Sequence, residues 1–395
     1  MVLTYRAKIL IILLVTLIFR ATSNMLQTSI PLYAKYVLHA SAFTVSLIAM
    51  LVNIAAFFSL LFFGFRSVAI GKAIFLSLIM VCVFPLLYLV TYDEFTFTFI
   101  SSIVAFWIGS LLPLLLATIA VTSGPQKRER ELTIFAATLS LGLVLGPIYQ
   151  GTLLSMTADN LVYSMLLFVP LVAVAAVFFS LVRLDENLKI AGNFDLGFTK
   201  RASYWVGILA LESFNMPFIA VVTFGGIFAR SNFGASYADI EFLFTGFFLT
   251  SFLVRLLLIR LTLSRYAVMM GSFVSTMLGL AIVYGSSTLG EVGLGFLLLG
   301  YSHGASYPIA TNQIANSAPK EKLVAAFTVS SLIDNIVYSL GTPIVGIIAQ
   351  YLGLNAVFIW VEMPVAAIAV AYLLLSKYIS VKTLARPVNI GKSLR

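Results

Sequence analysis

The sequence predicts an all-α polytopic membrane protein with twelve transmembrane helices in two pseudo-symmetric halves of six. Three observations predict this fold class: the composition, the long apolar runs and the distribution of basic residues. Hydrophobic residues make up 61% of the 395 residues and charged residues only 10%, whereas a soluble domain carries roughly 25% charged residues. A soluble fold of this composition would expose large apolar patches, so lipid is the expected solvent.

The apolar runs have the length of membrane helices, which need about 20 mostly apolar residues to cross a bilayer. Three of the longest contain no Asp, Glu, Lys or Arg: Ala73–Tyr92, Phe95–Gln126 and Leu132–Ala158. Strands of a β-barrel would be about 10 residues long and would alternate polar with apolar residues. We therefore expect helical spans near residues 9–36, 43–65, 70–92, 95–121, 132–156, 161–182, 202–228, 238–260, 266–286, 291–315, 324–350 and 355–376.

Basic residues gather on one side of the membrane if the amino terminus is cytoplasmic and the spans alternate. Of the 24 Lys and Arg residues, only Lys35 and Arg230 then lie outside, and only Arg20 and Arg255 lie within spans. This asymmetry follows the positive-inside rule, so we expect both termini in the cytoplasm and an even number of helices. The basic residues on the cytoplasmic side of the membrane account for the net charge of +9. We therefore expect no nucleic-acid partner.

The longest polar connection divides the chain near its middle. We expect an N-terminal six-helix bundle over residues 1–182, a cytoplasmic loop over 183–201, a C-terminal bundle over 202–376 and a cytoplasmic tail over 377–395. Short motifs recur at corresponding places in the two halves. The first and seventh spans share Asn-Met, at Asn24-Met25 and Asn215-Met216. The fifth and eleventh contain Gly142-Leu-Val-Leu-Gly146-Pro147-Ile-Tyr-Gln-Gly151 and Gly341-Thr-Pro343-Ile-Val-Gly346. Duplicated halves are a transporter architecture, in which the substrate binds between them near the midplane.

On these features the sequence resembles the major facilitator superfamily over nearly its whole length, and its drug–proton antiporter branch most of all. In that family the loop between helices 2 and 3 reads Gly-x-x-x-Asp-Arg-x-Gly-Arg-Arg. Here Gly64, Gly71 and Lys72 match it, whereas Val68 and Ala69 replace the Asp and the first Arg.

The fifth span resembles the family's antiporter motif, which ends in Gly-x-x-x-Gly-Pro-x-x-Gly-Gly. Gln150 stands at the first glycine of its final pair. The fourth span departs further, because Ala105 replaces the Arg that proton-coupled exporters carry four residues before a glycine. The resemblance implies that these motif residues serve the conformational change: Gly64, Gly71, Lys72, Gly142, Gly146, Pro147, Gly151, Gly341 and Pro343.

Polar and charged residues within the spans are the candidate site, because a charge at mid-bilayer costs about 2.5–3.5 kcal/mol on translocon scales. In the first span Arg20, Asn24 and Gln27 recur at helical spacing and form a polar stripe. Such a stripe is expected to face a central cavity, since its donors would go unsatisfied in lipid. Arg20 would bind an anionic group or balance an acid of the cavity, or else form a fixed ion pair between the halves.

Two acids lie deep in the second half. Glu212 is near the middle of the seventh span, with Asn215 one turn on, and Asp334 is deep in the eleventh. Burial disfavours the ionised form of a carboxyl, so either acid could carry a transported proton or contact substrate. The alternative for each is a static ion pair, which for Asp334 would involve Arg255.

A histidine near the centre of the tenth span leaves two alternatives open. His303 is followed one turn later by Tyr307 and could carry a proton near neutral pH. It could equally be a packing residue, because Gly300 and Gly304 have the spacing of close helix contacts. For Arg255 we expect snorkelling towards the inner surface or a structural ion pair.

These features predict a secondary transporter rather than an enzyme, with no cofactor and no metal, because the chain has no phosphate-binding loop and no metal-spaced His and Cys cluster. The leading hypothesis is proton-coupled export of amphipathic small molecules. One alternative is an organic-anion or metabolite permease in which Arg20 binds a carboxylate, and another is a receptor or scaffold that transports nothing. We expect the partners to be a small-molecule substrate, protons and the lipid of the plasma membrane, and the resemblance implies a working monomer.

Overall fold

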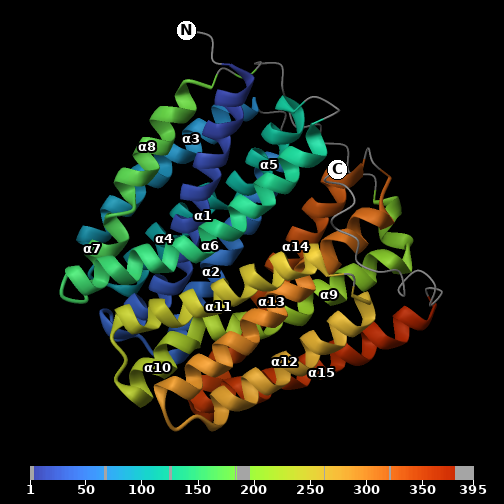
Figure 1. Ribbon diagram of the computed structural model, residues 1–395. Helices are drawn as coiled ribbons and strands as arrows, with labels where there is room; N and C mark the ends of the chain where they lie inside the picture. Colours follow the sequence, from blue (N-terminus) through green and yellow to red (C-terminus); the bar gives the residue numbers. More distant parts are fainter. Residues whose placement is uncertain are drawn as a thin grey trace. The chain divides into compact units, whose positions relative to one another are not determined.

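The computed structural model describes residues 4–65, 69–123, 127–182, 184, 196–261, 263–319 and 322–378. All regular secondary structure in these residues is helical (Figure 1), which confirms the predicted fold class. Most of the expected inter-half loop and tail, residues 185–195 and 379–395, lies outside the described residues.

Eleven helical segments among the described residues are long and apolar enough to cross a membrane. The remaining expected span, near 291–315, is present as the 29-residue helix α13, Leu289–Ser317. Its five Gly and three Ser residues, together with Asn312, Asn316 and His303, lower its hydropathy. A helix with so many polar residues needs protein or water around it rather than lipid.

The described residues of the first half of the chain form nine helical elements of differing length. These are α1 (Tyr5–Tyr36), α2 (Ala42–Phe65), α3 (Ile70–Val83), the 3₁₀ segment η1 (Phe84–Val90), α4 (Glu94–Gly109), α5 (Leu111–Thr122), α6 (Arg128–Met156), α7 (Leu161–Leu166) and α8 (Val169–Ser180). Proline accounts for two of the breaks within spans: Pro85 stands in the first turn of η1 and Pro170 in the first turn of α8. Proline has no N–H to donate, so it suits a first turn better than a helix interior.

The second half has the same helical character. It contains η2 (Gly197–Lys200), α9 (Ala202–Ala220), the π-helical segment η3 (Val221–Gly225), α10 (Gly226–Phe233), α11 (Tyr237–Arg260), α12 (Arg265–Gly285), α13, α14 (Leu323–Leu352) and α15 (Leu354–Tyr378). The π-helical turn follows Pro217 within the predicted seventh span. Proline lacks the N–H that would bond to the carbonyl four residues earlier, so it disturbs the preceding turn. Pro217 therefore does not by itself account for the π-helical turn at Val221–Gly225.

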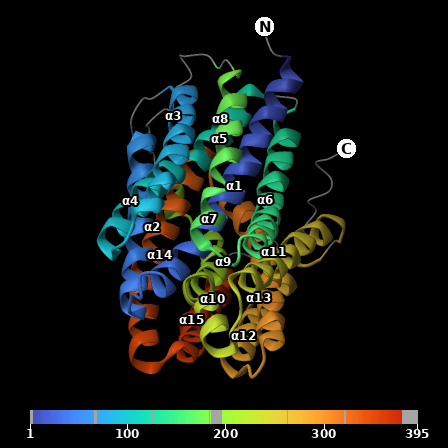
Figure 2. The ribbon, with the colours of Figure 1, turned by 90° about the vertical axis from the view of Figure 1, so that its left-hand side faces the viewer.

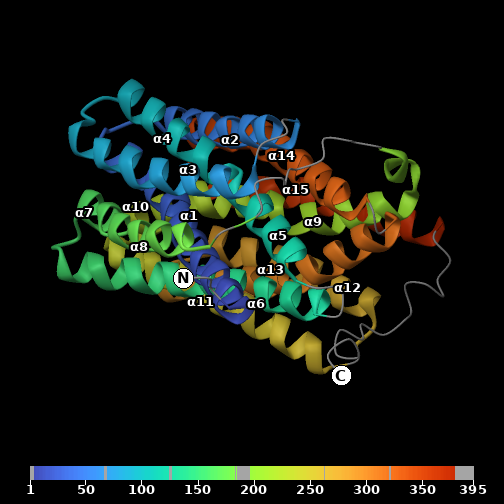
Figure 3. The ribbon, with the colours of Figure 1, turned by 90° about the horizontal axis from the view of Figure 1, so that it is seen from above.

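By Cα packing the chain forms two compact units. The N-terminal unit comprises residues 1–40, 48–193 and 236–241, and the C-terminal unit comprises 41–47, 194–235 and 242–395. In the first, α1 packs against α6 and α8, and α3 packs against α8 (Figure 2). In the second, α9 and α12 pack against α13 and also against α15 (Figure 3). The α9–α13 contact positions most of the candidate residues of the second unit.

Candidate functional site

The structure brings two of the predicted acids together in the C-terminal unit. Glu212 projects from α9 and Asp334 from α14, and their carboxyl groups lie against each other, with the amide of Asn215 beside both. Glu212 is only 5% exposed. Neither of its oxygens receives a well-aligned hydrogen bond from a donor group in the described part of the chain.

Two carboxyl groups in contact cannot both be ionised without strong repulsion. With a proton between them, one carboxyl donates a hydrogen bond to the other, and the pair titrates as a unit rather than as two separate acids. The arrangement can therefore hold and release a proton inside the membrane. Asp334, for which the sequence left a static ion pair with Arg255 as the alternative, lies against Glu212 and Asn215. Arg255 contacts residues of α13.

His303 lies at the crossing of α11 and α13. Glycine makes the crossing possible: a Cβ at Gly304 would meet the backbone oxygen of Ser251 at 2.5 Å, and one at Gly300 would overlap the backbone of Phe247. This confirms the close helix contact predicted from the spacing of these glycines. The contact places the Ser251 hydroxyl 2.7 Å from Nδ1 of His303.

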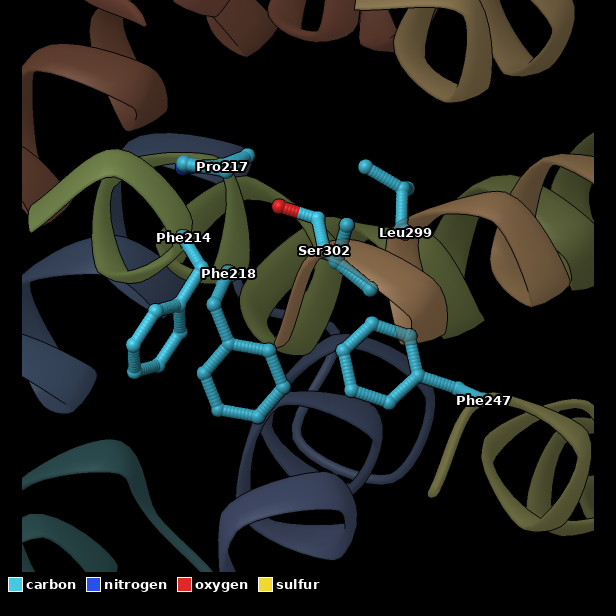
Figure 4. A pocket seen from close by; sticks show the side chains of 7 residues that line it. Phe214, Pro217, Phe218, Phe247, Leu299 and Ser302 are labelled. Carbon is cyan, nitrogen blue, oxygen red and sulfur yellow. The ribbon is translucent and has the colours of Figure 1, made fainter. Parts of the chain in front are cut away.

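Aromatic rings surround the imidazole of His303, which is 7% exposed. The ring centroids of Phe214, Phe218, Phe247 and Phe248 lie 4.8, 5.8, 5.4 and 5.8 Å from that of the imidazole. Three of these rings also line a small pocket, shown in Figure 4, with Pro217, Leu299 and Ser302. Its cavity volume of about 10 Å³ leaves room for about one water molecule.

Arg255 does not extend towards the end of α11 at Arg260. Its Nη2 lies 3.4 Å from Nδ1 of His303 and 3.5 Å from the His303 carbonyl oxygen. Its guanidinium carbon lies 4.9 Å from the centroid of the Tyr307 ring. The sequence predicted snorkelling or a structural ion pair for Arg255, and the contacts with His303 and Tyr307 were not foreseen.

The predicted polar stripe of the first span lies on α1, in the N-terminal unit. Asn24 is fully buried, and its Nδ2 donates to the Leu143 carbonyl oxygen at 3.2 Å, so it ties α1 to α6. Gln27 is partly buried, and its amide oxygen accepts no hydrogen bond within the described residues. The stem of Arg20 packs against Gly142, where a Cβ would approach the Arg20 Cβ to 2.9 Å.

The antiporter-like motif lies where α6 meets α1. A Cβ at Gly146 would meet the backbone of Ala21 at 3.0–3.1 Å, so Gly142 and Gly146 together let the two helices approach closely. Gln150 is fully buried, and its amide lies 2.5 Å from the Ser29 hydroxyl of α1. This contact explains how the motif tolerates an amide in place of glycine.

The other motif residues lie at these helix positions. Gly64 is near the end of α2, Gly71 and Lys72 are in the first turn of α3, and Pro147 and Gly151 continue α6. In α14, Gly341 and Pro343 are helical, and a Cβ at Gly341 would meet the Ile219 side chain at 2.8 Å.

Sequence reasoning missed one acid. The first residues of α11, up to Glu241, belong to the N-terminal unit. The side chain of Glu241 is fully buried and interacts with the Thr28 hydroxyl of α1. A carboxyl four residues into an apolar span was a signal that could have found it.

Comparisons with known proteins agree with this fold. The model of the family described as "Major Facilitator Superfamily" matches residues 12–229 and 206–392. Among solved structures, a peptide transporter POT in complex with sulfate has a TM-score of 0.78 at 12% identity, covering 96% of each chain. A bacterial homolog of the human lysosomal transporter Spinster, in an inward-facing and occupied conformation, has a TM-score of 0.72 at 14% identity, covering 94% of this chain and 97% of that one.

The nucleoside transporter NupG is similar to the same degree, with a TM-score of 0.73 at 14% identity, covering 94% of this chain and 99% of that one. At these identities the likeness shows the fold alone. A comparison with curated protein sequences finds no match.

Proposed function

The chain belongs to the major facilitator superfamily, and from this premise we propose that it is a proton-driven secondary transporter that moves a small amphipathic molecule by alternating access. The observation that carries the proposal is the contact between the carboxyls of Glu212 and Asp334. One proton held between them makes the pair singly charged, and a second proton neutralises it. Proton binding can thus change the charge of the C-terminal unit at a buried position.

The coupling follows from the cost of charge inside a membrane. An ionised pair needs water or a cation nearby, whereas a neutral pair can be enclosed by protein. We propose that the protonation state of the pair decides which arrangement of the transporter is favoured. The π-helical segment η3 begins nine residues after Glu212 on the same predicted span, and such segments often mark functional positions in helices.

The direction of transport is proposed from the antiporter-like motif. Gly142 and Gly146 lie in the closely packed contact of α6 with α1, and Pro147 follows Gly146 in the same helix. The presence of this motif at a close helix contact supports export by exchange with protons, as in the drug–proton branch. The distribution of basic residues supports cytoplasmic positions for both termini, and we propose a plasma-membrane location. The family resemblance implies that the transporter works as a monomer. The organic-anion permease remains the alternative.

Proton flux in proteoliposomes tests the proposal without a known substrate. Purified protein would be reconstituted with an internal pH indicator, and an amphipathic cation, anion and neutral compound of similar size would be added in turn. We expect at least one compound to move protons in the wild type, and Glu212→Gln and Asp334→Asn to abolish that flux. Glu94→Gln is the matched control, because Glu94 is an exposed acid in the first turn of α4.

Two results would count against proton coupling. In the first, a compound crosses the membrane at the wild-type rate without moving protons. In the second, both acid-pair variants move protons as the wild type does. A receptor or scaffold would transport none of the compounds.

A further inference from the structure

We propose that Asp159 is a latch of the alternating-access cycle: its carboxylate holds the first turn of α11 against the N-terminal unit, and this contact breaks when the transporter opens to the outside. The inference rests on the proposed transport function and assigns one residue to the control of its conformational change. Asp159 lies between α6 and α7, on the side that the distribution of basic residues predicts to be the outer one.

Two helices, α2 and α11, are each divided between the two compact units. Residues 236–241, where α11 begins, pack with the N-terminal unit, although the rest of α11 packs with the C-terminal unit. For α2 the division is reversed, because residues 41–47 pack with the C-terminal unit and the following residues with the N-terminal one. Residue 236 lies 195 positions after residue 41, close to the 196 positions that separate Pro147 from Pro343. The two shared helix ends are therefore equivalent positions of the duplicated halves, and both lie on the predicted outer side.

The Asp159 carboxylate holds the shared end of α11 through two backbone groups. Its Oδ2 accepts a hydrogen bond from the Tyr237 N–H at 2.9 Å, and its Oδ1 accepts one from the Ala238 N–H at 3.1 Å. The first N–H groups of a helix have no partner within the helix, and they form its positive end. A carboxylate that binds two of them makes a charge-assisted contact at two points.

The fold of α11 does not depend on this contact, because the helix has a cap of its own. The Ser236 N–H donates to Oδ2 of Asp239 at 2.9 Å, and the Asp239 N–H donates to the Ser236 hydroxyl at 3.0 Å. Reciprocal bonds of this kind form a capping box. What Asp159 adds is an attachment to another part of the chain, and α11 can keep its first turn when that attachment breaks.

The turn that carries Asp159 is fixed to the end of α6. The Asp159 N–H donates to the Leu154 carbonyl oxygen at 2.9 Å, and Ala158 and Asp159 have positive φ angles of 52° and 62°. The left-handed region is costly for residues other than glycine, and such positions gather at functional sites and switch segments. The carboxylate is thus presented to α11 from a defined position.

Further contacts of the first turns of α11 are with α1. The ring centroid of Tyr237 lies 6.2 Å from that of Tyr36, and Glu241, one turn further, interacts with the Thr28 hydroxyl. The side chains of Ala238 and Thr28 are only 8% and 2% exposed. If α11 moves away from the N-terminal unit, both of these side chains lose their cover, so they can report on the opening.

The equivalent end of α2 differs in its chemistry. A Cβ at Gly346 of α14 would overlap the Ser46 side chain, so α2 and α14 pack closely there. Residues 41–47 contain no charged side chain, whereas the end of α11 is held by a carboxylate. The charge-dependent control of outward opening therefore lies at α11, where removal of one carboxylate should shift the equilibrium.

Cysteine accessibility in intact cells tests the inference. Ala238→Cys or Thr28→Cys is introduced with Cys82→Ser, which removes the only native cysteine, and is labelled with a maleimide that does not cross membranes. Asp159→Ala should raise the labelling rate at both positions by about 10-fold to 100-fold, the equivalent of one charge-assisted hydrogen bond. Asp159→Asn should have a smaller effect, because its amide oxygen can still accept a hydrogen bond.

Two comparisons separate a latch from a local structural role. Fraying of the first turn of α11 would expose Ala238 alone, whereas movement of α11 away from α1 exposes Thr28 as well. Asp93→Ala is the matched control, because Asp93 caps α4 on the same predicted side through Thr96 of its own helix. Its loss should lower stability and leave the labelling rates unchanged.

Three results overturn the inference: unchanged labelling at both positions in Asp159→Ala, faster labelling at Ala238→Cys only, or an equal increase in Asp93→Ala. If Asp159→Ala does not yield folded protein, Asp159→Asn decides by the same criteria. The assay needs neither a substrate nor a proton gradient. Proton flux in the wild type with unchanged labelling in Asp159→Ala therefore rejects the latch alone, whereas absent flux with faster labelling rejects proton coupling alone.

Discussion

Replacing Gly304 by alanine tests whether the α11–α13 contact holds Ser251 and Arg255 against His303. A Cβ at this position would lie 2.5 Å from the Ser251 carbonyl oxygen and 2.8 Å from its Cα. Both are backbone atoms of a helix, so they cannot move aside individually. Ordinary contact begins at 3.4 Å, and α11 would therefore have to move away by about 1 Å.

The expected cost combines two opposing effects. Overpacking a tight contact destabilises by about 1–3 kcal/mol, whereas replacing glycine by alanine within a helix stabilises by about 1 kcal/mol. The net result should be a free energy of unfolding lower by up to about 2 kcal/mol. The displacement also moves Ser251 and Arg255 away from His303, so their contacts with its Nδ1 should weaken together with stability.

Thermal unfolding in detergent provides the assay, and Gly285→Ala provides the control. Gly285 ends α12, and no atom lies within 4 Å of a Cβ built there. We expect Gly304→Ala to melt a few degrees below the wild type and Gly285→Ala to melt at or above it. Equal melting temperatures for the two variants would refute the close packing at Gly304.

Two further predictions concern the N-terminal unit. Gln150→Leu removes the buried contact with the Ser29 hydroxyl and should lower stability by about 0.6–2 kcal/mol; a melting temperature unchanged from wild type would show that the contact contributes nothing. Hydrogen bonds from the Thr96 side chain and backbone lower the pKa of Asp93, which caps α4. Its contribution to stability is therefore present above the unfolded-state pKa of about 3.9 and is lost as the pH falls through the lower folded-state pKa. The melting temperatures of Asp93→Ala and wild type should accordingly differ at pH 7 and converge in acid, and a gap that widened in acid would contradict this assignment.

The helical fold could be predicted from the sequence because the length and apolarity of a segment are enough to identify a membrane helix. Breaks within the spans were harder to foresee. Pro85 and Pro217 are both visible in the sequence, but only packing decides whether a proline ends a helix, shifts it to 3₁₀ geometry as at η1, or is followed by a π-helical turn as at η3.

The site residues were found individually, but their partners were not. Periodicity places Glu212 and Asp334 within their helices, yet it does not give the rotation of one helix against another. Arg255 was expected to snorkel or pair with an acid, and its contacts with His303 and Tyr307 depend on the crossing at Gly304. A sequence shows which side chains are costly in a membrane, and the helix contacts show which of them meet.

Infrared spectroscopy of the purified protein tests the central claim most directly, because it detects the C=O stretch of protonated carboxyl groups and requires no substrate. At pH 7 the wild type should show a protonated-carboxyl band, and Glu212→Gln and Asp334→Asn should each change that band, because the two acids share one proton. Glu94→Gln should leave it unaltered. A wild-type spectrum without such a band, or a band that neither acid-pair variant affects, would contradict the proton-holding pair on which the proposed transport mechanism depends.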